Sequence, residues 1–418
     1  MKTRKHIPIK KINGYTVIMV PTPIDTMIVR ASVSAGFIHE TKDTLGIHHL
    51  LEHVLVDSSK QCQPNCMLYW DKEGCILNAT TENTTVNYFV KGLPDIADKM
   101  IDYITTILIR PMLSDMVLQR EKKAVLSELK MIMNTPDYKL SNVFNKAFYV
   151  PYGLQYNNDA ALQSRNVKFI TLQDLQEVHS TLYTPSNMVF VVYGKFSEPL
   201  VVRAFKKYLP VSSSVYSPVS CFSYTPSFLH VPHSSSTVMT MIGFPLRRQY
   251  EYTTVVEKLL SILLLNELRT KHKLVYGIQC SVNTDHCSTC LILQFECIQD
   301  VFLKTLRILF QVLHQYTTTP IESSMLKGVQ RRMTYAYSTD YNYDVYYSSY
   351  VYYPRPMLTK QQMIRHVNSF RVDMFQSFMK EIIQFNQCTV AYQYPTSFEI
   401  DWNTFLKIDA RGTTHLLS

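Results

Sequence analysis

The chain has 418 residues, which suits two or three domains that each bury a core of their own. Apolar residues make up 46% of it and charged residues 18%, which excludes a disordered or low-complexity chain. The net charge of +9 is mild for this length, and lysines and arginines cluster only at the start, so the composition does not indicate a nucleic-acid-binding protein. No apolar run reaches the roughly 18 residues of a membrane span. We expect a folded protein without a transmembrane segment.

The first half of the chain alternates between strand-like and helix-like segments. Residues 15–20 and 27–34 are rich in Val and Ile and predict two β-strands. A helix follows, which Asp43 or Thr44 can cap and which continues to about residue 55. The other expected elements are strands at 74–80, 86–90 and 188–193 and helices at 96–109, from Ser114 to before Pro136, and at 172–182.

Serine and proline are concentrated between residues 209 and 236, which is typical of a linker. The second half then repeats the earlier order of elements, although the two halves share little sequence. Its expected elements are strands at 237–244, 276–282, 291–297 and 388–392 and helices at 253–268, 301–316, 322–336 and 372–385. We therefore predict an α+β fold made by duplication of one unit, with a first domain at 1–208, a linker at 209–236 and a second domain at 237–418.

Nine cysteines are an odd number spread over a long chain, which indicates reduced thiols in a cytosol-like compartment. His286, Cys287 and Cys290 look like half of a zinc knuckle, but the nearest candidate for the other half, Cys62 and Cys66, lies in the first domain. We interpret these cysteines as incidental thiols. A strand follows the basic start almost at once, so any organelle address is expected to be short or internal.

The helix expected at 43–55 contains two histidines, His49 and His53, that are suited to bind a metal ion. They lie one turn apart on the same face, about 6 Å along the axis, so both imidazoles can reach one ion. Glu52 lies beside them, which gives the order His-x-x-Glu-His. His48 points about 100° away around the helix and is interpreted as a packing residue. Incidental histidines on a surface helix are the alternative.

A catalytic zinc site typically takes three protein ligands and leaves a fourth position to water. A third donor is therefore required. The helix that begins near Ser114 supplies Glu121 and Glu128, which lie seven residues apart on one face. One of them can bind the metal while the other supports the ligands.

With these residues in place, the chain resembles the pitrilysin-like M16 zinc peptidases, and most closely the short M16B subunits of the mitochondrial processing peptidase β type. In that family a liganding glutamate follows the inverted motif by some seventy-odd residues, with another glutamate seven residues before it. The resemblance implies one Zn²⁺ per chain, bound by His49, His53 and Glu128, with Glu52 as the general base and Glu121 in a supporting role. It also implies two related domains of the LuxS/MPP-like metallohydrolase type that close like a clamshell.

Two further segments match the family. Asn78 and Ala79, followed by Thr81, are similar to the edge strand on which a substrate pairs its backbone. Arg269 and Tyr276 match the Arg and Tyr, spaced by seven, that reach the substrate carbonyl from the second domain. The family's acidic residues for a substrate arginine have no clear counterpart at 137–145, where the only acid is Asp137, so the resemblance does not extend to arginine specificity.

The resemblance implies a zinc-dependent endopeptidase that hydrolyses extended peptides or targeting presequences. Zinc lowers the pKa of a bound water towards ~7, and Glu52 can accept its proton and return it to the leaving amine. The resemblance also favours a mitochondrion or a relic of one, with the cytoplasm as the alternative. A monomer, a homodimer and a heterodimer with a second M16-like subunit all fit it.

Two other classes of function remain open from sequence. A non-catalytic scaffold, such as a core subunit of a larger complex, predicts loss of His49, Glu52, His53 or Glu128, and all four are present. A nucleic-acid or membrane-surface binder is suggested by net charge alone. A general cytosolic peptide-degrading peptidase is the alternative within the enzyme class.

Overall fold

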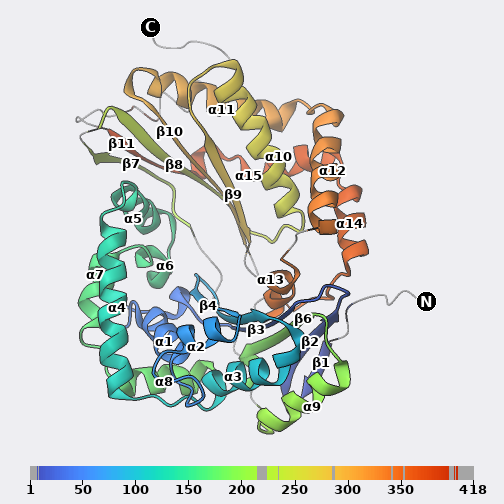
Figure 1. The fold of residues 1–418 in the computed structure, drawn as a ribbon. Helices are drawn as coiled ribbons and strands as arrows, with labels where there is room; N and C mark the ends of the chain where they lie inside the picture. Colours follow the sequence, from blue (N-terminus) through green and yellow to red (C-terminus); the bar gives the residue numbers. More distant parts are fainter. Residues whose placement is uncertain are drawn as a thin grey trace. The chain divides into compact units, whose positions relative to one another are not determined.

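The computed structural model describes residues 7, 9–213, 224–233, 235–284, 288–339, 342–351, 354–394, 400 and 402. The chain forms two compact units (Figure 1). Unit 1 comprises Met1–Asn134, Tyr152–Ser220 and Asn342–Thr359, and unit 2 comprises Thr135–Pro151, Cys221–Tyr341 and Lys360–Ser418.

Unit 1 is built on a six-stranded sheet in the order β1-β2-β6-β3-β5-β4. Its strands are β1 (Ile9–Ile12), β2 (Tyr15–Pro21), β3 (Met27–Val33), β4 (Ile76–Thr81), β5 (Val86–Gly92) and β6 (Met188–Gly194). β2 and β6 are parallel and the other neighbours are antiparallel. β2 and β6 are buried over almost their whole length, which explains their near-continuous runs of Val, Ile and Met.

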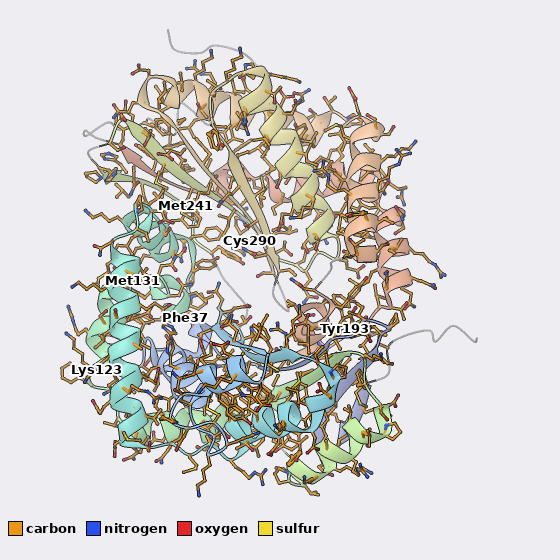
Figure 2. All side chains as sticks on the ribbon, in the orientation of Figure 1. Phe37, Lys123, Met131, Tyr193, Met241 and Cys290 are labelled. Carbon is orange, nitrogen blue, oxygen red and sulfur yellow. A yellow bond between two sulfur atoms is a disulfide. The ribbon has the colours of Figure 1, made fainter. Side chains whose placement is uncertain are left out.

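Helices cover the sheet of unit 1. They are α1 (Ile47–Val56), α2 (Cys66–Lys72), α3 (Ala97–Ile109), α4 (Asp115–Met133), α6 (Tyr152–Tyr156), α7 (Ala160–Val167), α8 (Leu172–Leu182), α9 (Glu198–Tyr208) and α13 (Tyr343–Ser348). α1 and α4 carry the residues expected to bind a metal. α1 packs on β4, and α4 packs against both α1 and α7. Figure 2 shows Lys123 projecting outward from α4, on the side away from α1.

Unit 2 contains a five-stranded sheet in the order β7-β11-β8-β10-β9. Its strands are β7 (Ser227–Pro232), β8 (Thr237–Leu246), β9 (Ile278–Thr284), β10 (Thr289–Ile298) and β11 (Thr389–Tyr394). Its helices are α5 (Tyr138–Phe148), α10 (Thr253–Leu265), α11 (Phe302–Thr318), α12 (Ser323–Thr339), α14 (Lys360–Ser369) and α15 (Val372–Ile382). A π-helical segment, Asn266–Lys271, extends α10.

α5 packs directly on the sheet of unit 2, against β7, β8 and β11. Its approach is close at Gly243 of β8, where an added Cβ would lie 2.7–2.9 Å from ring atoms of Phe144 and Phe148. Glycine is therefore required at this position for the two aromatic rings of α5 to reach the sheet.

The two sheets share one topology once the additional hairpin strand β1 is set aside. β2-β6-β3-β5-β4 in unit 1 corresponds to β7-β11-β8-β10-β9 in unit 2, with one parallel pair at the same place in each sheet. α1 lies between β3 and β4 in sequence, as α10 lies between β8 and β9. The mixed α+β fold and the two related domains predicted from sequence are confirmed.

Most expected elements are present, with two kinds of difference. The helix expected from residue 43 begins at Ile47, with Gly46 as its N-cap, so the prediction that Asp43 or Thr44 caps it was wrong. Sequence patterns also gave no prediction for several other elements, among them β1, α2, α5 and α13.

The compact units are discontinuous in sequence, unlike the predicted domains at 1–208 and 237–418. The segment 135–151, with α5, belongs to unit 2, and the segment 342–359, with α13, belongs to unit 1. In unit 1, α13 packs on β3 and β6, and buried Asp344 accepts a hydrogen bond from Arg30 of β3 at 2.8 Å. The expected linker at 209–236 includes β7, and its residues 214–223 and 234 lie outside the described part of the chain.

Among the helices that the structure describes, none has the length and apolar character needed to cross a membrane.

Candidate metal centre

The buried carboxylate of Glu40 and the N-cap residue Gly46 fix the start of α1. Gly46 has φ 92°, a backbone conformation that favours glycine. The carboxylate of Glu40 accepts hydrogen bonds from the N–H groups of Gly46 at 2.8 Å and His48 at 3.0 Å. It thereby satisfies two of the unpaired donors at the helix N-terminus. Burial raises the pKa of Glu40 to about 8, although these two N–H groups lower it.

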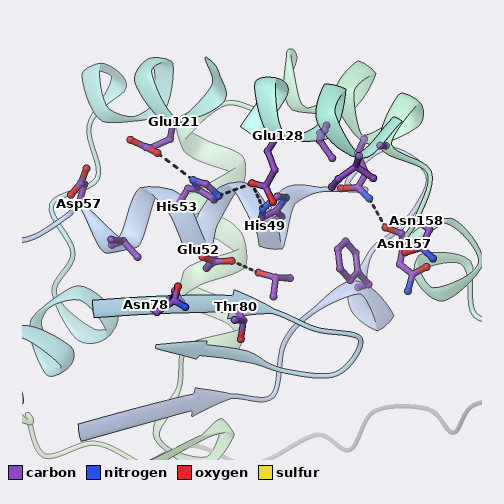
Figure 3. Close-up of a pocket in the computed structure, with 18 of the residues that line it drawn as sticks. His49, Glu52, His53, Asp57, Asn78, Thr80, Glu121, Glu128, Asn157 and Asn158 are labelled. Atoms are coloured by element: carbon purple, nitrogen blue, oxygen red, sulfur yellow. Dashed lines mark hydrogen bonds and ion pairs between the residues drawn. The ribbon is translucent and has the colours of Figure 1, made fainter. Parts of the chain in front are cut away.

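His49 and His53 of α1 face Glu128 of α4. Glu128 Oε2 lies 3.4 Å from His49 Nε2 and 3.6 Å from His53 Nε2 (Figure 3). One ligand atom from each residue lies within 4.8 Å of the others. Two atoms bound at about 2.1 Å to one tetrahedral zinc ion are about 3.4 Å apart, so both carboxylate–imidazole distances fit a shared zinc ion.

Glu121 contacts the far side of the His53 ring. Its Oε2 lies 3.3 Å from His53 Nδ1, and its Oε1 accepts a hydrogen bond from Arg120 Nε at 2.7 Å. A carboxylate that binds the second ring nitrogen fixes the orientation and tautomer of a metal-binding histidine. Glu121 is therefore placed to turn Nε2 of His53 towards Glu128.

The charges of this cluster are arranged for a cation. Burial lowers the pKa of His53, but its contacts with Glu121 and Glu128 outweigh burial and raise that pKa to about 10. Hydrogen bonds from His49 and His53 hold the pKa of Glu128 well below its usual range. A divalent cation would replace the proton on His53, because metal binding requires a deprotonated imidazole.

Glu52 lies in the same pocket but outside the three-residue ligand cluster. Glu52 is 8% exposed, and its Oε2 accepts a hydrogen bond from the Thr81 hydroxyl at 3.0 Å. Burial raises the pKa of Glu52, while His49 and His53 lower it. The geometry leaves this carboxylate available to exchange a proton beside the metal centre.

Strand β4 runs along the same pocket, which has a volume of about 620 Å³. Asn78 and Ala79 of β4 line it, together with apolar side chains that include Phe37, Met67 and Ile132. Among the described strands β4 pairs only with β5, so its other edge is available for an extended peptide.

Arg269 and Tyr276 belong to unit 2, at the π-helical segment and just after it. The guanidinium of Arg269 lies over the ring of Tyr276, 4.8 Å from its centroid, and Tyr276 is 86% exposed. Their expected role at the substrate carbonyl stays a prediction.

The expectation of reduced thiols was wrong at one pair, because Cys62 and Cys66 form a disulfide. Both cysteines are buried, Cys62 in the loop between α1 and α2 and Cys66 at the first position of α2. The other described cysteines, Cys75, Cys280, Cys290, Cys297 and Cys388, are free thiols as expected, and the compartment stays a prediction. Cys290 is buried, whereas His286 and Cys287, the other members of the half zinc knuckle, lie outside the described residues.

Three residues that support the site were not found from sequence: Glu40, Asp57 and Arg120. Arg120 is adjacent to Glu121, and Asp57 follows His53 by one turn, so their positions could have drawn attention to them. Their contacts depend on how α1, α4 and the loop between α1 and α2 pack, for which no local pattern exists.

The fold and the site together define a two-unit α+β protein with an inverted His-x-x-Glu-His motif in a cluster that could hold a metal ion. The model of the insulinase domain of peptidase family M16 matches residues 16–157, and that of the peptidase M16 inactive domain matches residues 170–333. The chain belongs to the M16 peptidase family.

Relatives of known sequence include processing peptidases and bacterial zinc proteases. The mitochondrial-processing peptidase subunit beta of Neurospora crassa is 28% identical over 223 residues, which cover 52% of this chain and 46% of the relative. The uncharacterized zinc protease YmxG of Bacillus subtilis is 25% identical over 194 residues, which cover 45% of this chain and 46% of the relative. The matches therefore span less than half the length of these relatives.

Solved structures share the fold along almost the whole chain. A peptidase M16 inactive domain from Pseudomonas fluorescens superposes with a TM-score of 0.81 at 15% identity, covering 94% of this chain and 99% of the other. A protease from Helicobacter pylori superposes with a TM-score of 0.79 at 18% identity, covering 94% of this chain and 100% of the other.

Proposed function

We propose that the chain is a zinc-dependent metalloendopeptidase that hydrolyses extended peptides, including targeting presequences. The observation that carries the proposal is the convergence of His49, His53 and Glu128 at separations that suit one tetrahedral zinc ion. The Glu52 carboxylate beside them, outside the ligand cluster, supports a hydrolase more than a structural metal site.

Each residue has a part in the proposed reaction. A bound zinc ion would supply a Lewis acid that acidifies water and polarises the peptide carbonyl. Glu52 accepts the proton of the attacking water and returns it to the nitrogen of the leaving amine. The free edge of β4, at Asn78 and Ala79, holds the peptide backbone extended by strand addition. Glu121 holds the His53 ring in place.

The names of the relatives support the finer parts of the proposal. Several are β subunits of mitochondrial processing peptidases, which supports a second M16-like subunit as partner and a mitochondrion or relic of one as the compartment. Fractionation of cells that express the tagged chain, followed by identification of co-purified proteins, tests both.

Replacement of Glu52 by Gln tests the reaction. We expect Glu52→Gln to lower kcat by about 10²–10⁴ while one zinc ion per chain is retained, because only the proton acceptor is removed. Cleavage of an arginine-bearing presequence peptide and of a neutral peptide is followed by mass spectrometry, with and without chelator. Chelation should stop wild-type cleavage, and added zinc should restore it.

Glu257→Gln is the matched control, because Glu257 lies on α10, the helix of unit 2 that corresponds to α1. It should leave the cleavage rate unchanged. Cleavage by Glu52→Gln at the wild-type rate would remove Glu52 from the mechanism, and a wild-type chain that cleaves neither peptide would favour a scaffold.

A further inference from the structure

Arg120 occupies a junction that the proposed mechanism does not use. It lies on α4 next to Glu121, and its side chain is 41% exposed. Every nitrogen of its guanidinium has a partner in unit 1. Nε donates to Glu121 Oε1 at 2.7 Å, Nη1 donates to the carbonyl oxygen of Pro64 at 2.7 Å, and Nη2 pairs with Asp57.

These partners connect three elements around the metal centre. Asp57 is the C-cap of α1, one turn after His53, and its Oδ1 accepts a hydrogen bond from the Cys66 N–H at 2.7 Å. Pro64 lies inside the loop that the Cys62–Cys66 disulfide closes. The guanidinium thus links α4 to the end of α1 and to this loop.

The carboxylate of Glu121 connects Arg120 to the proposed metal ligand His53. One oxygen of Glu121 is held by Arg120 and the other lies against His53 Nδ1. Without Arg120, the carboxylate of Glu121 would lose the partner that fixes its rotation. The ring of His53 would then lose the contact that directs its Nε2 towards Glu128.

We propose that Arg120 is a positioning residue of the metal centre, which fixes Glu121 and the end of α1 so that His53 and Glu128 meet at one ion. The inference rests on the proposed zinc site. It requires the planar guanidinium, because a lysine ammonium is a point charge that cannot hold three acceptors in one fixed arrangement. An incidental surface ion pair would leave metal binding unchanged.

Metal binding of Arg120→Ala, Arg120→Lys and the wild type tests this inference. Zinc affinity is measured by competition with a chelating dye, and coordination geometry is read from the visible spectrum of the Co²⁺-loaded chain. We expect Arg120→Ala to weaken zinc binding about 10–100-fold and to change the Co²⁺ spectrum. Arg120→Lys should recover only part of the affinity.

Arg371→Ala is the matched control, since Arg371 forms a two-bond pair with Asp373 on the surface of unit 2. It should behave like the wild type, and circular dichroism of each metal-free variant shows that it is folded. Wild-type affinity and spectrum in Arg120→Ala or in Arg120→Lys would overturn the inference while leaving the proposed function intact. A wild-type chain that binds no zinc would overturn both.

Discussion

α1 and α10 occupy the same place in two sheets of the same topology, yet only α1 can hold a metal. α1 presents His49, Glu52 and His53 to a pocket beside the edge strand β4. α10 has the sequence TTVVEKLLSILLL, with no histidine and one acid, Glu257, which accepts a hydrogen bond from the Val282 N–H at 3.3 Å. The shared topology provides the place, and the side chains provide the chemistry.

The helices α4 of unit 1 and α12 of unit 2 show the same contrast. α4 follows the hairpin β4–β5 and the helix α3, and it supplies Glu121 and Glu128. α12 likewise follows the hairpin β9–β10 and the helix α11, but it contains no acidic residue. The unit 2 helices that correspond to α1 and α4 therefore lack the ligands for a dication. This agrees with the match of residues 170–333 to a domain model described as inactive.

Unit 2 carries Arg269 and Tyr276, for which the family resemblance implies a role at the substrate. If Arg269 and Tyr276 donate to the substrate carbonyl, Tyr276→Phe and Arg269→Ala should each lower kcat by about 10²–10³, the usual effect of losing one donor to a developing oxyanion. Zinc content should not change. Steady-state cleavage of one peptide and metal analysis of the same samples measure both quantities.

Tyr335→Phe is the control for Tyr276→Phe, because Tyr335 is another exposed tyrosine of unit 2 at 70% exposure. It should leave kcat unaltered. An unchanged kcat in Tyr276→Phe would show that its hydroxyl contributes nothing to the reaction.

A smaller effect is expected from Glu40, which has no counterpart in the predicted site. Its pKa is raised from 4.5 to about 8 by burial, so the folded chain binds this proton more tightly than the unfolded chain does. The stabilisation is complete below pH 4.5 and is lost as the pH rises through about 8. From pH 5 to pH 8 the free energy of unfolding should decrease by roughly 3–4 kcal/mol more in the wild type than in Glu40→Gln.

Urea unfolding of the metal-free chains at both pH values measures this difference. The Glu40→Gln chain is the control, because it keeps every other group that titrates in this pH range. Equal pH dependence in the two chains would show that Glu40 is ionised in the folded state across the range.

Local rules were sufficient for part of the fold and part of the site. Ser114 accepts a hydrogen bond from Val117 N–H and begins α4, and α8 begins after the Thr171 capping box, both within the predicted limits. The spacing of His49 and His53 follows from helix geometry alone. Elements with such short-range signals could be located from the sequence.

The remaining features depend on packing between distant segments. Glu128 follows His53 by 75 residues and meets the histidines because α4 packs on α1. Only the family resemblance predicted that Glu128 lies at the site. Glu40 caps α1 across a loop, and Arg120 joins α4 to the loop that Cys62 and Cys66 close. Residue spacing cannot predict these contacts, because they are made through loops that have no regular period.

Diffraction from crystals of the purified chain, recorded above and below the zinc absorption edge, locates the metal directly. We predict one anomalous peak in unit 1, about 2.1 Å from a nitrogen of His49, a nitrogen of His53 and an oxygen of Glu128, with Glu52 and Glu121 unbound. No peak at these atoms, or a peak that Glu121 binds in place of Glu128, would contradict the assignment of the metal centre.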